Sequence, residues 1–138
     1  MKIKLIDYGY EFAPKRAHWN DAGADVHAMK AFNIGPGLTQ KIPLGFGLKL
    51  PDGFMAIMMP RSGQASNGIV SQVAPGDSGY TGELHAIITN NNPTNTFKVR
   101  KGDRIAQLVI VPIIMADYVS EGELGKERGN DGFGSTGV

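Results

Sequence analysis

The sequence predicts an all-β protein, and three observations support this fold class. Glycine and proline are frequent, with 19 glycines and 8 prolines among 138 residues, and they divide the chain into short segments. Several of these segments alternate apolar and polar residues, as half-buried strands do. No window of about eleven residues or more has the period of an amphipathic helix. We therefore expect roughly nine or more strands arranged as a sandwich, jelly roll or barrel.

The individual elements follow from the apolar pattern along the chain. A short strand is expected after Asp25, and other extended segments are expected at residues 2–6, 31–39, 41–49, 54–59, 84–89, 97–100, 105–114 and about 117–120. Residues 62–68 are the candidate for one short helix. Residues 74–84 read as a β-hairpin, because three glycines free the backbone there: Gly76, Gly79 and Gly82.

Composition excludes several classes of function. A net charge of +1 gives no large basic face, so direct binding of nucleic acid is not expected. The chain has no cysteine, which excludes disulfides and thiolate metal sites and is typical of a cytoplasmic protein. No segment approaches the length of apolar sequence that a membrane helix needs, so we expect no membrane association.

The chain divides into a β core domain at residues 1–124 and a C-terminal segment at residues 125–138. Five of the last fourteen residues are glycines, and Phe133 is the one large apolar residue among them. Such a segment cannot offset its own ordering entropy, so we expect it to be mobile. It is either a frayed terminus or an arm that closes over a ligand, with Arg128, Ser135 and Thr136 as phosphate donors.

Residues 74–84 are the first candidate for a small-molecule site. The segment carries one carboxylate, Asp77, and one aromatic ring, Tyr80, between glycines that allow close approach of the backbone to a ligand. The alternative is an ordinary turn in which the ring packs and the acid caps the backbone.

Three further positions are ambiguous when each is taken alone. Asp25 lies between small residues, which leaves room for a hydrated cation, or it caps a turn. Ser62, after Arg61 at a strand end, is either a helix cap or an anion-binding residue. Gln107 interrupts an apolar strand, and a buried amide needs a partner in a loop or in a ligand. The histidines lack metal-ligand spacing, and none is assigned a role.

Taken together and in this order, the candidate segments form a pattern. They are Ala-Gly-Ala-Asp-Val around Asp25, Pro60-Arg-Ser-Gly63, Gly76-Asp-Ser-Gly-Tyr-Thr-Gly-Glu83, Gly102-Asp-Arg-Ile-Ala-Gln-Leu-Val109 and Arg128-Gly-Asn-Asp-Gly-Phe-Gly-Ser-Thr-Gly137. They resemble the five motifs of the trimeric dUTPase (dUTP diphosphatase) family, and the resemblance spans nearly the whole chain. It implies a jelly-roll-like, β-clip subunit that forms a homotrimer with shared active sites.

The resemblance also implies an activity: hydrolysis of dUTP to dUMP and pyrophosphate, which keeps uracil out of DNA and supplies dUMP for dTMP synthesis. It implies that Asp77 activates the water that attacks the α-phosphorus, while Arg61, Ser62 and Gln107 contact the phosphates. Asp25 would hold Mg²⁺ through water. The implied substrate-binding residues are Ser71, Ala74, Tyr80 and Gly82 for the nucleoside, and Arg128, Phe133, Gly134, Ser135 and Thr136 in a neighbour's arm.

The chain departs from the family pattern at two places. Ser71 and Ala74, followed by Pro75-Gly76, stand where the family usually has an asparagine, a glycine and a small apolar pair. Asp131 replaces a glycine of the arm and adds a negative charge near the triphosphate.

Three alternatives to the dUTPase are open, and the third, a jelly-roll structural protein, would not need the arm at all. The first is a dCTP deaminase of the same fold, or a bifunctional deaminase–diphosphatase, in which Glu83 would be the proton shuttle. The Tyr80 position and the complete Phe-Gly-Ser-Thr-Gly arm favour the diphosphatase. The second is a non-catalytic trimer that regulates an unidentified protein partner, for which no docking insertion is visible between the motifs.

Overall fold

The computed structural model describes residues 1–72 and 75–122. The predicted arm, the boundary at residues 124 and 125, and Ala74 lie outside the described residues. The described elements are β1 (Lys4–Asp7), β2 (Ala24–His27), β3 (Phe32–Ile34), β4 (Thr39–Pro43), β5 (Phe46–Lys49), β6 (Phe54–Met59), α1 (Ser62–Ala65), β7 (Ile69–Ser71), β8 (Pro75–Gly76), β9 (His85–Asn90), β10 (Phe97–Val99) and β11 (Arg104–Pro112).

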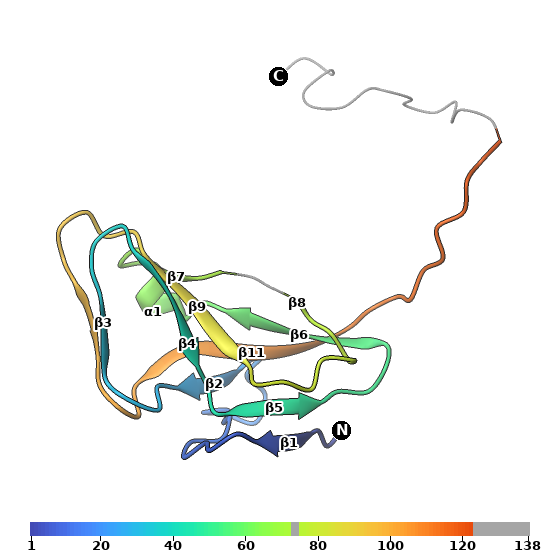
Figure 1. The fold of residues 1–138 in the computed structure, drawn as a ribbon, viewed down its shortest axis with the longest axis horizontal. Helices are drawn as coiled ribbons and strands as arrows, with labels where there is room; N and C mark the ends of the chain where they lie inside the picture. Colours follow the sequence, from blue (N-terminus) through green and yellow to red (C-terminus); the bar gives the residue numbers. More distant parts are fainter. Residues whose placement is uncertain (73–74, 123–138) are drawn as a thin grey trace.

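The strands form four antiparallel groups in a single body. The largest sheet has the order β2-β11-β6-β8, a second has the order β4-β9-β7, and two further pairs are β1-β5 and β3-β10. Neighbours in these sheets are far apart in the chain, as β2 and β11 show (Figure 1). This non-local pairing is the jelly-roll-like, all-β fold that the sequence predicts.

One core joins these groups of strands. Its largest fully buried apolar side chains come from different sheets or the turns beside them: Val26, Ile34, Leu44, Phe46, Ile88 and Ile105. Burying a side chain of this size stabilises the fold by about 1.5–3 kcal/mol, so the core is the main source of stability. Among the described residues, no helix is long and apolar enough to cross a membrane.

Most predicted strands are confirmed, and β6 covers residues 54–59 as predicted. The run at 41–49 is two strands rather than one, because the chain turns at Gly45, whose φ of 75° is in the left-handed region. The predicted helix at 62–68 is confirmed as the short α1 followed by a turn.

The prediction of a hairpin at 74–84 was wrong. β8 pairs with β6, whereas β9 pairs with β4 and β7, so the two ends of this segment enter different sheets. The hairpin is β7 with β9, and residues 72–84 are a long excursion between its strands. Pro75 contributes no amide hydrogen to a ladder, which limits β8 as a strand.

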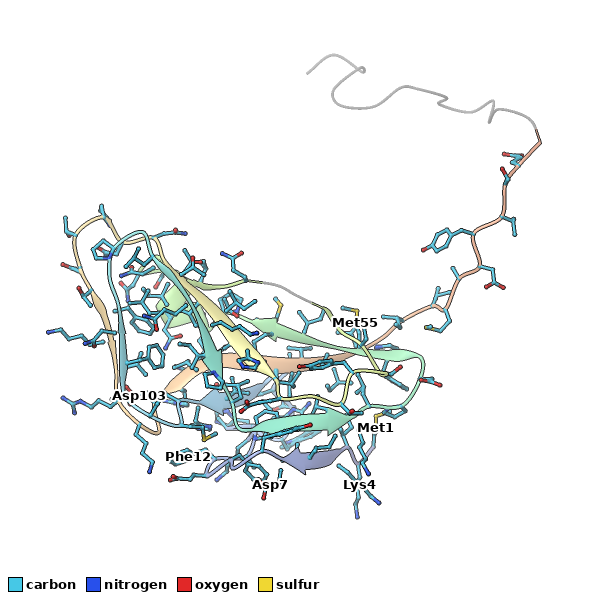
Figure 2. All side chains as sticks on the ribbon, in the orientation of Figure 1. Met1, Lys4, Asp7, Phe12, Met55 and Asp103 are labelled. Atoms are coloured by element: carbon cyan, nitrogen blue, oxygen red, sulfur yellow. The ribbon has the colours of Figure 1, made fainter. Side chains whose placement is uncertain are left out.

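The predicted strand at 117–120 was also wrong. Residues 113–122 contain no strand and extend away from the body after β11 (Figure 1). Their side chains stand free along the segment (Figure 2), and several of them are large and apolar, namely Ile114, Met115, Tyr118 and Val119, which are 72–97% exposed.

Candidate active site

Strand β11 brings three of the predicted site segments together. Gln107 lies opposite Asp25 of β2 on one side and opposite Met59 of β6 on the other. Because Pro60 and Arg61 directly follow Met59, the register of one central strand places Arg61 beside Asp25 and Gln107.

The Gln107 amide is held by the neighbouring loop. Its Nε2 donates to the Pro60 carbonyl at 2.9 Å. On the other side it packs against the α-carbon of Gly23, where an added Cβ would lie 2.5 Å from the Gln107 Oε1. The Gln107 amide, although it lies in an apolar strand, therefore has a hydrogen-bond partner within the chain, and this contact fixes its orientation.

A β-bulge adds Arg104 to this group. Residues 104 and 107 would point to opposite faces of a regular strand, because side chains alternate. The register of β11 against β2 shifts between Arg104 and Ala106, and consecutive residues Ile105 and Ala106 are both buried. An extra residue in the strand thus brings Arg104 to the side of Gln107.

These residues surround a hollow of about 270 Å³, which we call the arginine hollow. It is lined by Ala17, Asp21, Ala22, Gly23, Asp25, Arg61, Ser62, Arg104 and Gln107. Four predicted site residues, Asp25, Arg61, Ser62 and Gln107, therefore meet in one place. Arg104 and Gly23 were missed, since the first needs the bulge and the second contributes only its lack of a side chain.

Of the two aspartates that line the arginine hollow, Asp25 pairs with the arginines, whereas Asp21 pairs with His18. The Asp25 carboxylate lies 3.1 Å from Arg61 Nε and 3.7 Å from an Arg104 guanidinium nitrogen. Only 18% of the Asp25 side chain is exposed, so solvent screens these pairs less than it screens surface pairs. The two guanidinium groups share the Asp25 carboxylate and keep further N–H donors for an anion, and guanidinium is well matched to phosphate.

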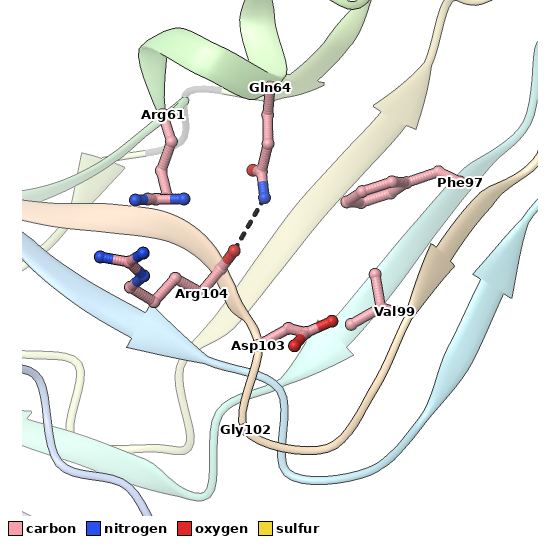
Figure 3. Close-up of a pocket in the computed structure, with 7 residues that line it drawn as sticks. All are labelled: Arg61, Gln64, Phe97, Val99, Gly102, Asp103 and Arg104. Atoms are coloured by element: carbon pink, nitrogen blue, oxygen red, sulfur yellow. Dashed lines mark hydrogen bonds between the residues drawn. The ribbon is translucent and has the colours of Figure 1, made fainter.

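Both arginines also border a second hollow of about 280 Å³, lined by Gln64, Phe97, Val99, Gly102 and Asp103 together with them. Figure 3 shows Arg61 and Arg104 facing each other across its edge. The amide of Gln64 donates to the Arg104 carbonyl at 2.7 Å, which ties α1 to the start of β11. This bond holds the backbone from which Arg104 extends.

The donor set around Asp25 suits only one kind of metal site. The part of the chain that the structure describes has no group of three acidic, histidine or cysteine residues that could hold an ion. Mg²⁺ is commonly bound by one or two carboxylates together with substrate phosphates and water. Asp25 therefore fits an ion that arrives with a phosphate ligand, and not a resident ion held by protein alone.

His27 lies two residues after Asp25 in β2. Burial lowers the pKa of its imidazole, and the nearby arginines act in the same direction, outweighing the opposing charge of Asp25. The ring lies 5.6 Å from the ring of Phe12. His27 is thus a neutral residue at neutral pH, packed near Phe12.

Asp77 and Tyr80 lie elsewhere, on the excursion between β7 and β9. The Tyr80 amide donates to the Asp77 carbonyl at 3.1 Å, which closes a turn and leaves the Asp77 side chain exposed. Tyr80 borders a smaller hollow of about 110 Å³, the tyrosine hollow, with Ala56, Met58, Gln72, Gly76, Leu84, His85, Ile87 and Leu108. One chain therefore presents the predicted site in two separate places.

The remaining predicted residues of this segment differ in position. Gly82 lies under the Tyr80 ring, since a Cβ there would be 2.6 Å from the Tyr80 hydroxyl oxygen. Ser71 is only 6% exposed, and its hydroxyl has no hydrogen-bond partner among the described residues. The arm residues Arg128, Phe133, Gly134, Ser135 and Thr136 lie outside the described residues.

Glu83, the proton shuttle of the deaminase alternative, is already engaged. Its carboxylate accepts the backbone N–H of Gly45 at 2.8 Å. The side chain borders none of the three hollows described here, which gives no support to that alternative.

Known proteins resemble this chain along nearly its whole length. A family model described as dUTPase matches residues 10–137. The deoxyuridine 5'-triphosphate nucleotidohydrolase of Tropheryma whipplei (strain Twist) is 41% identical over 99% of this chain and 96% of its own length. That of Corynebacterium glutamicum is 41% identical over 98% of this chain and 94% of its own length.

Solved structures agree on the fold. The dUTPase of Staphylococcus bacteriophage 80alpha, solved with dUPNHPP, has a TM-score of 0.86 at 27% identity and covers 99% of both chains. The dUTPase D95N mutant of phage phi11 of S. aureus, which coordinates a structural Mg(II) ion, has a TM-score of 0.83 at 24% identity over 91% of this chain and 100% of the phage chain. With a family model and relatives that span almost the entire sequence, this chain belongs to the dUTPase family and is a hydrolase of that family.

Proposed function

We propose that the protein hydrolyses dUTP to dUMP and pyrophosphate. The observation that carries the proposal is the arginine hollow, in which Arg61, Arg104, Ser62 and Gln107 converge around Asp25. The named relatives support the choice of nucleotide, because they are deoxyuridine 5'-triphosphate nucleotidohydrolases. The bacteriophage 80alpha enzyme, solved with dUPNHPP, supports it too. The product would serve dTMP synthesis, and removal of dUTP would keep uracil out of DNA.

In the proposed reaction the arginine hollow binds the triphosphate. Arg61 and Arg104 donate to phosphate oxygens, and their positive charge offsets the charge that builds up on the leaving pyrophosphate. Ser62 donates to the bridging oxygen on the leaving side, and Gln107 orients the α-phosphate. The Pro60 contact holds the Gln107 amide in advance, so little reorganisation is needed when substrate binds.

Asp77 supplies the group that directs the attacking water. The water adds to the α-phosphorus, the bond from that phosphorus to the bridging oxygen breaks, and the water proton passes to the carboxylate. Pyrophosphate leaves with the electron pair of the broken bond. Mg²⁺, bound mainly by the phosphates and through water to Asp25, would neutralise charge on the triphosphate.

We further propose a homotrimer with active sites between subunits. The two hollows are separate in one chain, so a nucleotide that touches both Tyr80 and Arg61 requires more than one copy. The exposed apolar residues of the segment 113–122 would be covered by a neighbour. Arg128, Ser135 and Thr136 of a neighbouring arm would bind the γ-phosphate, with Phe133 and Gly134 over the uracil.

Product analysis tests this function directly. The purified protein is incubated with Mg²⁺ and, in separate reactions, with dUTP, dCTP, dTTP or UTP, and products are identified by ³¹P NMR and ion exchange. We expect dUMP and pyrophosphate from dUTP alone. Release of ammonia from dCTP would assign the deaminase instead, and the absence of any product would contradict the proposal.

A further inference from the structure

The loop that carries Tyr80 is fastened to the strand pair β1-β5 and the turn before β5. The Tyr8 hydroxyl, just after β1, donates to the Thr81 carbonyl at 2.9 Å. The Gly45 N–H donates to the Glu83 carboxylate at 2.8 Å. Between these points the loop backbone crosses Gly47 so closely that a Cβ there would lie 2.5 Å from the Gly82 carbonyl oxygen. Residues 81–83 are therefore clamped from outside the loop.

Glu83 is the centre of this clamp because both its backbone carbonyl and its side-chain carboxylate accept hydrogen bonds. Its carbonyl accepts the Tyr80 hydroxyl at 3.0 Å and faces His85 Nδ1 at 3.1 Å. The next residue, Leu84, donates its N–H to the Phe46 carbonyl at 2.8 Å. The peptide group that carries the Glu83 carbonyl is thereby aligned with β5. The charge-assisted bond from Gly45 to the part-buried carboxylate is stronger than a bond between neutral groups.

The direction of the Tyr80 ring depends on this arrangement. The ring lies against Gly82, and the residue as a whole is 50% exposed. The hydroxyl bond to Glu83 fixes the far end of the ring. A ring backed by protein and fixed at its tip cannot move aside for a larger ligand without breaking these contacts.

We propose that Glu83 is a positioning residue which, through Tyr80, sets how strongly the protein prefers a deoxyribonucleotide to a ribonucleotide. The inference rests on the proposed function, in which Tyr80 lies under the sugar. Glu83 does not touch substrate in this proposal. A ribose carries one hydroxyl more than a deoxyribose. The site excludes this hydroxyl only if the Tyr80 ring beside the sugar resists displacement.

The test compares Glu83→Ala with Glu83→Gln. The glutamine Oε1 can still accept the Gly45 N–H, whereas alanine removes the acceptor. We expect Glu83→Ala to reduce the ratio of kcat/KM for dUTP to that for UTP by about tenfold, as for the loss of one charge-assisted hydrogen bond. Glu83→Gln should restore most of the ratio, and Tyr8→Phe should give a smaller reduction. Asn92→Ala, which removes a side-chain acceptor of the backbone N–H groups of Thr94 and Asn95, is the matched control.

A second readout does not require activity. Hydrogen exchange at the Gly45 amide, followed by NMR, should accelerate in Glu83→Ala and stay slow in Glu83→Gln and Asn92→Ala. An unchanged dUTP to UTP ratio in Glu83→Ala and Tyr8→Phe would overturn the proposal, whatever happens to the melting temperature. If Glu83→Ala fails to fold, the dUTP to UTP ratios of Tyr8→Phe and Glu83→Gln decide whether the proposal holds. If the Gly45 amide of the wild-type protein is protected from exchange but the protein does not hydrolyse dUTP, the proposed function is contradicted. The clamp on residues 81–83 is then unaffected.

Discussion

At the scale of single residues, Asp25 has two arginine partners, whereas the sequence suggested a hydrated cation or a turn cap. Its carboxylate lies within ion-pair distance of both Arg61 and Arg104. Without it, two positive side chains would face each other across the hollow and repel. Asp25 therefore orients both arginines even without a metal ion.

We predict that Asp25→Asn weakens binding of a non-hydrolysable dUTP analogue about tenfold or more, from the loss of charge-assisted hydrogen bonds. The measurement is titration calorimetry in Mg²⁺ and, separately, in EDTA. Because the arginine pairs exist without metal, the weakening should occur in both buffers.

The control for this prediction is Glu11→Gln, which removes one charge from the exposed pair with Lys101. That pair is at the surface, so binding should not change. If Asp25→Asn weakened binding only with Mg²⁺ present, the role of Asp25 would lie in the metal shell and not in orienting the arginines.

At the scale of secondary-structure elements, the arginine hollow is organised by β11 and its neighbours. Gln107 is packed between the Pro60 carbonyl and the α-carbon of Gly23. The loop before β2 can approach β11 this closely only because residue 23 has no side chain. A glycine that contacts no ligand thus contributes to the geometry of the site.

We predict that Gly23→Ala lowers kcat/KM for dUTP by about 10- to 100-fold, because a displacement of about 1 Å at a reacting group has effects of this size. The new methyl group would displace the Gln107 amide from Pro60. Steady-state kinetics measure the effect. Gly35→Ala is the control, since its nearest contact is the flexible end of Leu38 at 3.3 Å, and it should retain activity. Full activity in Gly23→Ala would show that the orientation of Gln107 does not matter.

The sequence predicted most strands, and it predicted four residues of the arginine hollow through the resemblance of their motifs. It could not predict the partner of each strand, because pairing of β8 with β6 and of β9 with β4 and β7 depends on contacts distant in sequence. It also missed Arg104, since a β-bulge breaks the alternation on which strand patterns rest. The predicted strand at 117–120 failed because its apolar residues have no partner strand among the described residues.

At the scale of the whole molecule, two features point beyond a single chain. The arginine hollow and the Tyr80 loop are separate, and the segment 113–122 exposes large apolar residues away from the body. Both features are explained if neighbouring copies complete the site and cover the segment.

Two truncations separate assembly from catalysis. Removal of residues 125–138 should leave the trimer intact and reduce turnover of dUTP strongly, because the proposed arm is lost. Removal of residues 113–138 should dissociate the trimer as well. Light scattering coupled to size exclusion and activity assays measure both effects. Full activity without residues 125–138 would contradict the role of the arm.

Mixed trimers test whether the site is shared. Asp77→Asn should abolish turnover while leaving nucleotide binding largely intact, and Arg61→Ala should abolish it by weakening phosphate binding. When the two variants are unfolded, mixed and refolded together, some sites combine an intact Asp77 with an intact Arg61. We expect activity to return in the mixture and not in either variant refolded alone. No recovery, with mixed trimers verified by mass spectrometry, would mean that each chain builds its own site.

The bulge in β11 has a consequence for how this site can change over evolution or in the laboratory. Arg104 and Gln107 point into the same hollow because of the bulge, since in a regular strand residues three apart point to opposite faces. If the same residues formed a regular ladder without the bulge, Arg104 would turn to the opposite face of the sheet while every site side chain stayed in the sequence. A comparison by composition or by aligned motif letters would register almost no difference, yet the phosphate site would have lost one of its two cations.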